Sequence, residues 1–162
     1  KIISLILGGP NKYYKFNKDQ LIKIFNIIKT NFIYKGYKII VVPSMRTPKT
    51  IIDLAIKEVG EYGHVVNNID KQAYLSAYAL ADYVVVTCDS TSMISEAAAS
   101  GKPIFIAHMK AKKNNYRFKR FFDLFKKMGI TRDLGGKIET WSYNKHNEAQ
   151  RIALELKKKI KN

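Results

Sequence analysis

The chain has 162 residues, 46% of them hydrophobic, and a formal charge of +16 at pH 7. This length and apolar content suffice for one buried core, which excludes an intrinsically disordered chain. No apolar run approaches the roughly 20 residues that cross a bilayer, and a single cysteine, Cys88, excludes an internal disulfide and a thiolate zinc cage. We therefore expect one soluble domain over residues 1–162, with the cytoplasm as its default location.

The predicted elements alternate between strand and helix. Continuous β-branched runs predict strands, and apolar residues at helical spacing predict helices. In chain order they are a strand at 2–7, a helix at 18–34, a strand at 37–42, a helix at 50–61, a weaker strand at 64–66, a helix at 73–81, a strand at 83–87, a helix at 92–100, a strand at 103–107 and helices at 116–128 and 147–160. This alternation, with several strands that show no polar alternation, predicts an α/β fold: a doubly wound parallel sheet with helices on both faces.

Local signals fix several helix ends. Asn17 or Asn11 can cap the first helix, and Gly36 marks its end.

The apolar stripes of the last two helices are expected to lie in the core. They comprise Phe118, Phe121, Phe122 and Phe125 in the first and Ala149, Ile152, Ala153, Leu156 and Ile160 in the second. Since Lys1 leads directly into an apolar strand, we expect the domain to lack a part that precedes it.

The charge alone would suggest a polyanion partner. Only five of the 29 basic residues are arginine, however, and the bidentate contacts that read phosphates and bases favour arginine over lysine. The excess of lysine is better explained by an AT-rich genome or a solvated surface. We therefore do not expect nucleic acid as a partner.

Three loops follow predicted strands and should meet at one edge of the sheet, where open α/β sheets bind ligands. The third is the most informative, because its hydroxyl groups precede a helix of small residues. The free N–H groups and the dipole of a helix N-terminus attract phosphate. The predicted phosphate-binding residues of this loop are Asp89, Ser90, Thr91 and Ser92.

Glu96 lies four residues after Ser92, so both side chains share one helix face. A ligand whose phosphate meets Ser92 can place a ribose diol against the Glu96 carboxylate. The residue three positions before Glu96 is Met93, which cannot form a capping box. The structural alternative is that Ser and Thr only cap the helix and that the negative charge of Glu96, in an early turn, interacts favourably with the helix dipole.

The other two loops supply Gly8, Gly9, Lys12 and Arg46 as further candidates for the phosphate site. The glycines allow close approach of the backbone and could add N–H donors, although Gly-Gly is also ordinary turn chemistry. Lys12 and Arg46 could neutralise phosphate or simply be exposed cations. The basic stretch 110–120 is better interpreted as solvated surface.

No catalytic group or metal site emerges from the sequence. Cys88 has no histidine at an interpretable spacing, so it is interpreted as a core or strand-end residue. His64, His108 and His146 lack the spacing of metal ligands. The catalytic residues thus stay unknown, and no cofactor or metal is predicted.

The segment 87–106 resembles the nucleotide-sugar-binding segment of the C-terminal domain in GT-B-fold glycosyltransferases and in the non-hydrolysing sugar-nucleotide 2-epimerases. That resemblance implies a Rossmann-like domain of the GT-B C-terminal type. It implies that Glu96 contacts ribose and that the ligand is a nucleotide diphosphate such as UDP, or a nucleotide-sugar. Any glycosyl transfer would rest on charge stabilisation of the leaving diphosphate and would need a second, N-terminal lobe.

A wider set of motifs is similar to the mitochondrial-fission ELM family. These motifs are Gly8–Phe16, Pro43–Pro48, Ala79–Asp82, the segment 87–106, Arg117–Asp123 and Trp141–Ala149. The resemblance implies the C-terminal half of such a protein. It also implies an alternative function, a non-enzymatic adaptor that recruits a protein partner or lies peripherally on an anionic membrane, and an epimerase-like activity is a further possibility.

Overall fold

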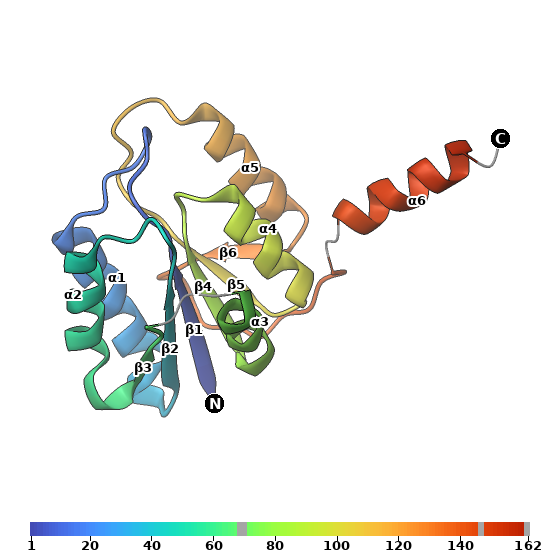
Figure 1. Ribbon diagram of the computed structural model, residues 1–162. Helices are drawn as coiled ribbons and strands as arrows, with labels where there is room; N and C mark the ends of the chain where they lie inside the picture. Colours follow the sequence, from blue (N-terminus) through green and yellow to red (C-terminus); the bar gives the residue numbers. More distant parts are fainter. Residues whose placement is uncertain (68–70, 146–147, 161–162) are drawn as a thin grey trace.

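The computed structural model describes residues 1–67, 71–145 and 148–160, in which strands and helices alternate (Figure 1). The strands are β1 Ile2–Leu7, β2 Lys38–Pro43, β3 Gly63–Val65, β4 Tyr83–Thr87, β5 Ile104–Ala107 and β6 Thr131–Asp133. The α-helices are α1 Lys18–Asn31, α2 Lys49–Val59, α3 Lys71–Leu80, α4 Thr91–Ser100, α5 Tyr116–Lys127 and α6 Glu148–Ile160. Two short 3-10 turns, η1 Ile33–Lys35 and η2 Gly60–Tyr62, follow α1 and α2.

All strand pairs are parallel, and the sheet has the order β3-β2-β1-β4-β5-β6. At its centre, Leu5 of β1 lies beside Val41 of β2 and Val85 of β4. The chain builds the sheet outward in one direction from β1 and then crosses over to β4 on the other side of β1. This reversal is the topological switch point of a doubly wound sheet, and the predicted α/β fold class is confirmed.

Each face of the sheet has its own hydrophobic core. Residues Leu5 and Val85 point to the face covered by α1 and α2, where Phe25 is fully buried. Residues such as Ile6 and Val86 point to the opposite face, which α3, α4 and α5 cover. Because both faces are buried, the strands carry apolar side chains at consecutive positions. This explains why their sequences lack polar alternation.

Most predicted boundaries agree with the structure. Asn17 is the residue that caps α1, since its Oδ1 accepts a hydrogen bond from the Gln20 N–H at 3.0 Å. The helix ends at Asn31, earlier than predicted, and the chain continues as the 3-10 turn η1 to Gly36, which has a φ of 88°. A positive φ favours glycine, so Gly36 ends the helical segment as expected.

Two features differ from the sequence-based expectations. Strand β6 was not predicted, because three residues of the sequence Thr-Arg-Asp carry no strand pattern of their own. The apolar stripe of α6 was expected in the core, but α6 projects from the domain (Figure 1), and the side chains of residues 152–160 are exposed. Exposed fractions reach 46% at Ile152, 54% at Leu156 and 82% at Ile160. The side chain of Ala149 lies outside the described residues.

None of the helices in the described ranges has both the length and the apolar content required to cross a membrane.

Candidate functional site

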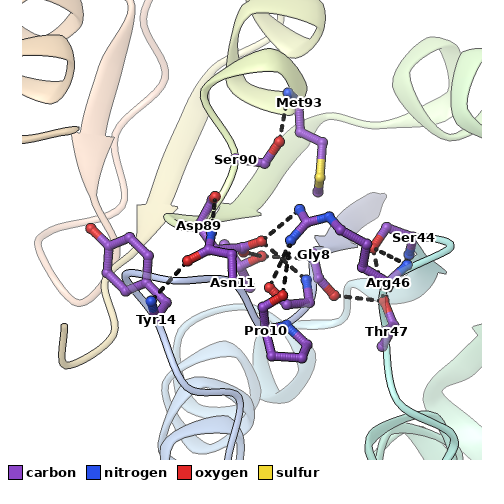
Figure 2. Close-up of polar contacts among 12 residues, drawn as sticks. Gly8, Pro10, Asn11, Tyr14, Ser44, Arg46, Thr47, Asp89, Ser90 and Met93 are labelled. Carbon is purple, nitrogen blue, oxygen red and sulfur yellow. Dashed lines mark hydrogen bonds and ion pairs between the residues drawn. The ribbon is translucent and has the colours of Figure 1, made fainter. Parts of the chain in front are cut away.

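The three loops predicted to meet at the carboxyl edge of the sheet do so (Figure 2). The loop after β1 contacts the loop after β2 through Thr47, whose hydroxyl donates a hydrogen bond to the Gly8 carbonyl at 2.6 Å. It contacts the loop after β4 through Asn11, whose side-chain amide donates to the Asp89 carbonyl at 2.9 Å. The site therefore lies at the switch point between β1 and β4, where ligands bind in open α/β sheets.

Asp89 is the centre of this network. The residue is 2% exposed, and its Oδ2 accepts hydrogen bonds from the Gly9 N–H at 3.0 Å and from Arg46 Nη2 at 2.9 Å. Its Oδ1 accepts a hydrogen bond from the Thr87 hydroxyl at 2.7 Å. Burial raises the pKa of Asp89 above its ordinary value, while the bonds from Thr87, Gly9 and Arg46 oppose that rise. All three donors match an ionised carboxylate, so the network holds Asp89 as a paired anion.

Gly8 and Gly9 are required here by close packing. A Cβ on Gly8 would lie 2.1 Å from Oδ2 of Asp89, and a Cβ on Gly9 would lie 2.2 Å from the Arg46 carbonyl oxygen. The Gly8 N–H donates to Thr87 Oγ1 at 2.8 Å, and the Gly9 N–H donates to Asp89. Both N–H groups already have acceptors within the chain, which corrects the expectation that they serve as donors to a ligand.

Arg46 is part of the Asp89 network, and both of its terminal guanidinium nitrogens already have acceptors there. Its Nη1 donates to the Gly9 carbonyl at 2.8 Å while Nη2 pairs with Asp89. The side chain remains 43% exposed, so part of the guanidinium still faces solvent. Lys12, by contrast, is exposed and its ammonium lies over the Tyr13 ring, 5.1 Å from the ring centroid. Lys12 is thus a solvent-exposed cation beside the Tyr13 ring.

The hydroxyl-rich turn forms the start of α4 as predicted. Ser90 is the N-cap, and its Oγ accepts a hydrogen bond from the Met93 N–H at 3.4 Å. Thr91 and Ser92 occupy the first turn, with Thr91 half-buried and Ser92 exposed. The N–H groups of a first helical turn have no acceptor within the helix. This end of α4 therefore has the donors that phosphate needs.

Glu96 is exposed one turn further along α4. It lines a cavity of about 300 Å³ between α3 and α4, together with Tyr78 of α3. Tyr74, one turn before Tyr78, donates its hydroxyl to the Pro43 carbonyl at 3.0 Å. Burial raises the pKa of Tyr74, and the charges of Glu96, Arg46 and Asp89 also act on it. Tyr74 is therefore within electrostatic range of both the Asp89 network and Glu96.

Tyr74 and Tyr78 were not predicted from the sequence as part of the site. Their spacing of four residues places both on one face of α3, as Ser92 and Glu96 share one face of α4. That pairing of two helical faces was the available signal. It was missed because the sequence does not reveal that these faces oppose each other.

Cys88 has no reactive environment. It is buried, and its sulfur accepts a hydrogen bond from the Met109 N–H at 3.2 Å. Burial raises the pKa of the thiol to about 11, so it stays protonated at neutral pH. This confirms its interpretation as a strand-end core residue. Within the described ranges, no group of three or more His, Cys, Asp or Glu side chains could hold a metal ion.

Comparison with solved structures shows the fold. The peptidyl-cysteine decarboxylase EpiD is similar with a TM-score of 0.53 and 11% identity, over 96% of this chain and 98% of that one. A Listeria monocytogenes protein described as a UDP-N-acetylglucosamine 2-epimerase aligns less closely, with a TM-score of 0.47 and 13% identity over 95% of this chain and 35% of that one, and this alignment carries no argument about the fold.

Comparison with protein sequences identifies the family of the chain. An uncharacterised protein of Rickettsia prowazekii is 30% identical over 98% of this chain and 46% of its own length. The mitochondrial fission protein ELM1 of Arabidopsis thaliana is 25% identical over 98% of this chain and 38% of its own length. The chain thus spans less than half the length of these curated relatives. The model of the family described as mitochondrial fission ELM1 matches residues 1–160, so the chain belongs to that family.

Proposed function

We propose that this chain binds a nucleoside diphosphate, free or as part of a nucleotide-sugar. The observation that carries the proposal is the combination of a hydroxyl-capped helix N-terminus, a partly exposed arginine and a carboxylate one turn along the same helix face. The first two suit a diphosphate, and the third suits the hydroxyl groups of a ribose.

In the proposed complex, Ser90, Thr91 and Ser92 and the N–H groups of the first turn of α4 hold the diphosphate. In this proposal the partly exposed Arg46 and the exposed Lys12 supply the positive charge that balances the phosphates. Arg46 also neutralises the buried Asp89, which would otherwise repel an anion at this position. Since these cations and the helix dipole balance the diphosphate, the proposal includes no metal ion.

If the whole protein is an enzyme, the groups described here support only one part of a glycosyl transfer. Arg46 and the start of α4 would stabilise the charge that develops on a leaving diphosphate. The acceptor and any general base would come from outside this chain, which spans less than half the length of its curated relatives. The isolated chain is therefore expected to bind ligand without turning it over.

Calorimetric titration with UDP tests the proposal. Glu96→Gln should weaken binding about tenfold, because a neutral amide accepts hydrogen bonds from ribose more weakly than a carboxylate. Glu61→Gln is the matched control, since Glu61 is exposed in η2 beside β3 and away from the site. The Glu61→Gln protein should bind UDP with the affinity of the wild type. Absence of binding to UDP, ADP, GDP and CDP alike would refute the proposal.

A second candidate function is favoured by α6. Its exposed apolar side chains Ile152, Leu156 and Ile160 recur every four residues, and Lys157–Lys159 occupy its last turn. A helix with exposed apolar and basic side chains suits the interface of an anionic membrane. In this alternative the protein is a non-enzymatic adaptor on a membrane surface.

Vesicle co-sedimentation tests this alternative. The protein should sediment with vesicles that contain anionic phospholipid and stay in solution with zwitterionic vesicles, because the lysines supply about 1 kcal/mol each near an anionic surface. The double variant Ile152→Ser, Leu156→Ser should abolish sedimentation, whereas Ile56→Ser, at an exposed position of α2, should not. Equal sedimentation of the double variant and the wild type would exclude α6 as the contact.

A further inference from the structure

Another cavity lies at the start of α4, on the side of α5. Its volume is about 350 Å³, within the range of small-ligand pockets. It is lined by Tyr13 of the loop after β1, Thr91 of α4, and Arg117, Phe118 and Phe121 of α5. Thr91 is the first residue of α4 and belongs to the hydroxyl-rich turn. The cavity therefore adjoins the proposed phosphate site.

Aromatic rings form most of the cavity wall, and they are held in place by other rings. Tyr13 and Phe118 meet edge to face, with ring centroids 5.3 Å apart. The Phe121 ring lies 4.2 Å from the ring of Phe125, which is buried, at an angle of 31° between their planes. The face of an aromatic ring carries partial negative charge and attracts the C–H groups of a sugar. The wall thus suits a hexose ring.

Arg117 supplies polar donors to the same cavity. It is exposed, and within the part of the chain that the structure describes its guanidinium has no hydrogen bond or ion pair. Arg46 differs, because both of its terminal nitrogens already have acceptors. The donors of Arg117 are therefore free for sugar hydroxyl groups. None of the described residues that line the cavity is acidic, so nothing in the wall competes for these donors as a carboxylate would.

The geometry of α4 places this cavity and Glu96 on different sides of the helix. Successive residues of an α-helix are about 100° apart, so Glu96, five positions after Thr91, lies about 140° around the helix axis from it. In agreement, Glu96 lines the cavity between α3 and α4, whereas Thr91 lines the one beside α5. A diphosphate at the start of α4 whose ribose lies toward Glu96 therefore has its other end on the side of α5.

We propose that the cavity between α4 and α5 binds the sugar of a nucleotide-sugar. The inference rests on the proposed nucleotide site and narrows its ligand from a free nucleoside diphosphate to a nucleoside diphosphate hexose. Phe118 and Phe121 pack against the sugar ring, and Arg117 donates hydrogen bonds to its hydroxyl groups. A nucleobase also stacks on aromatic rings, but it is joined to the ribose and so belongs on the side of Glu96.

The test compares UDP with UDP-glucose, UDP-galactose and UDP-N-acetylglucosamine in calorimetric titrations. The nucleotide-sugar that binds the wild type most tightly is then titrated into Phe121→Leu, which removes the ring, and into Arg117→Gln, which removes the charged donors. Each variant should bind that nucleotide-sugar about five- to tenfold more weakly, because it loses one contact with the sugar. Each should bind UDP within about twofold of the wild type, since UDP has no sugar beyond its diphosphate.

Arg120→Gln is the matched control for the loss of charge. Arg120 is also exposed on α5, but its guanidinium lies 5.8 Å from the centroid of the Tyr116 ring, and it is not among the residues that line the cavity. The loss of one distant positive charge acts on both anionic ligands, so the ratio of their affinities should stay that of the wild type.

Thermal unfolding separates a role in binding from a role in folding. Arg117→Gln should melt within about 2 °C of the wild type, because an exposed side chain without a partner contributes little to stability. Its titrations therefore remain decisive even where Phe121→Leu is destabilised by the loss of its contact with Phe125.

The outcomes distinguish the two proposals. The sugar site is wrong, and the nucleotide site stands, if the wild type binds UDP but none of the three nucleotide-sugars. The same holds if the ratio of the two affinities is unchanged in Arg117→Gln and Phe121→Leu, or if both ligands weaken equally. If no nucleotide binds the wild type, the proposed function is wrong and the sugar site is wrong with it.

Discussion

Asp89→Ala is expected to lower the free energy of unfolding by about 3–5 kcal/mol, the cost of removing one partner from a buried ion pair and its hydrogen bonds. The substitution leaves the Gly9 N–H and the Thr87 hydroxyl without their acceptor in a buried environment. Arg46 is partly exposed, so its guanidinium can turn to solvent and need not stay unpaired. The buried Gly9 and Thr87 donors have no such escape. A loss of this size is a large fraction of the stability of an ordinary domain.

Urea unfolding followed by circular dichroism measures this effect. Asp53→Ala provides the matched control, since Asp53 is exposed on α2, where it forms a solvated ion pair with Lys49. An exposed pair of this kind contributes about 0.3–0.5 kcal/mol, so this variant should unfold close to the wild type. Equal stabilities of the two variants would contradict the assignment of Asp89 as the centre of the loop network.

Gly9→Ala is expected to cost about 1–3 kcal/mol or more, the range for inserting a methyl group into packed surroundings. The added Cβ would lie 2.2 Å from the Arg46 carbonyl oxygen and 2.6 Å from the Arg46 Cβ. The nearest of these atoms is backbone, so no rotation of a side chain can relieve the clash. The loop after β2 must move, which should separate Arg46 from Asp89 and weaken any ligand that Arg46 binds.

Gly136→Ala is the control for this variant, because its nearest neighbour outside the local chain would lie 3.6 Å from the added Cβ, an ordinary contact distance. Thermal melting of both proteins, followed by nucleotide titration, measures the two consequences. A Gly9→Ala protein that melts like Gly136→Ala and binds nucleotide like the wild type would show that the close approach of the two loops is dispensable.

The fold could be predicted because local and long-range preferences agree. The run 83–87 carries aromatic or β-branched residues at every position, and all five are buried in the parallel sheet. Strand β6 could not be predicted, because the residues Thr131–Asp133 form a strand only by pairing with β5. The exposure of the apolar stripe of α6 could not be predicted either. Such a stripe indicates that a helix face can pack against a hydrophobic surface, but it does not indicate whether that surface lies in the same chain.

The site was predictable in its location and less so in its internal contacts. Parallel strands end at one edge, so the three loops had to meet there. The sequence could not reveal that Asp89 would bond to Gly9, about 80 residues away, and so use the N–H groups expected for a ligand. The same holds for Tyr78 of α3, which lines one cavity together with Glu96 of α4.

The most direct test of the nucleotide site is a nuclear magnetic resonance titration of the isotope-labelled protein with UDP. We expect saturable shifts of the backbone amides of Ser90, Thr91, Ser92 and Glu96 and of the Arg46 side chain, while the amides of α6 stay unchanged. Saturable shifts confined to other elements, or no shift at millimolar UDP, would contradict the proposed site.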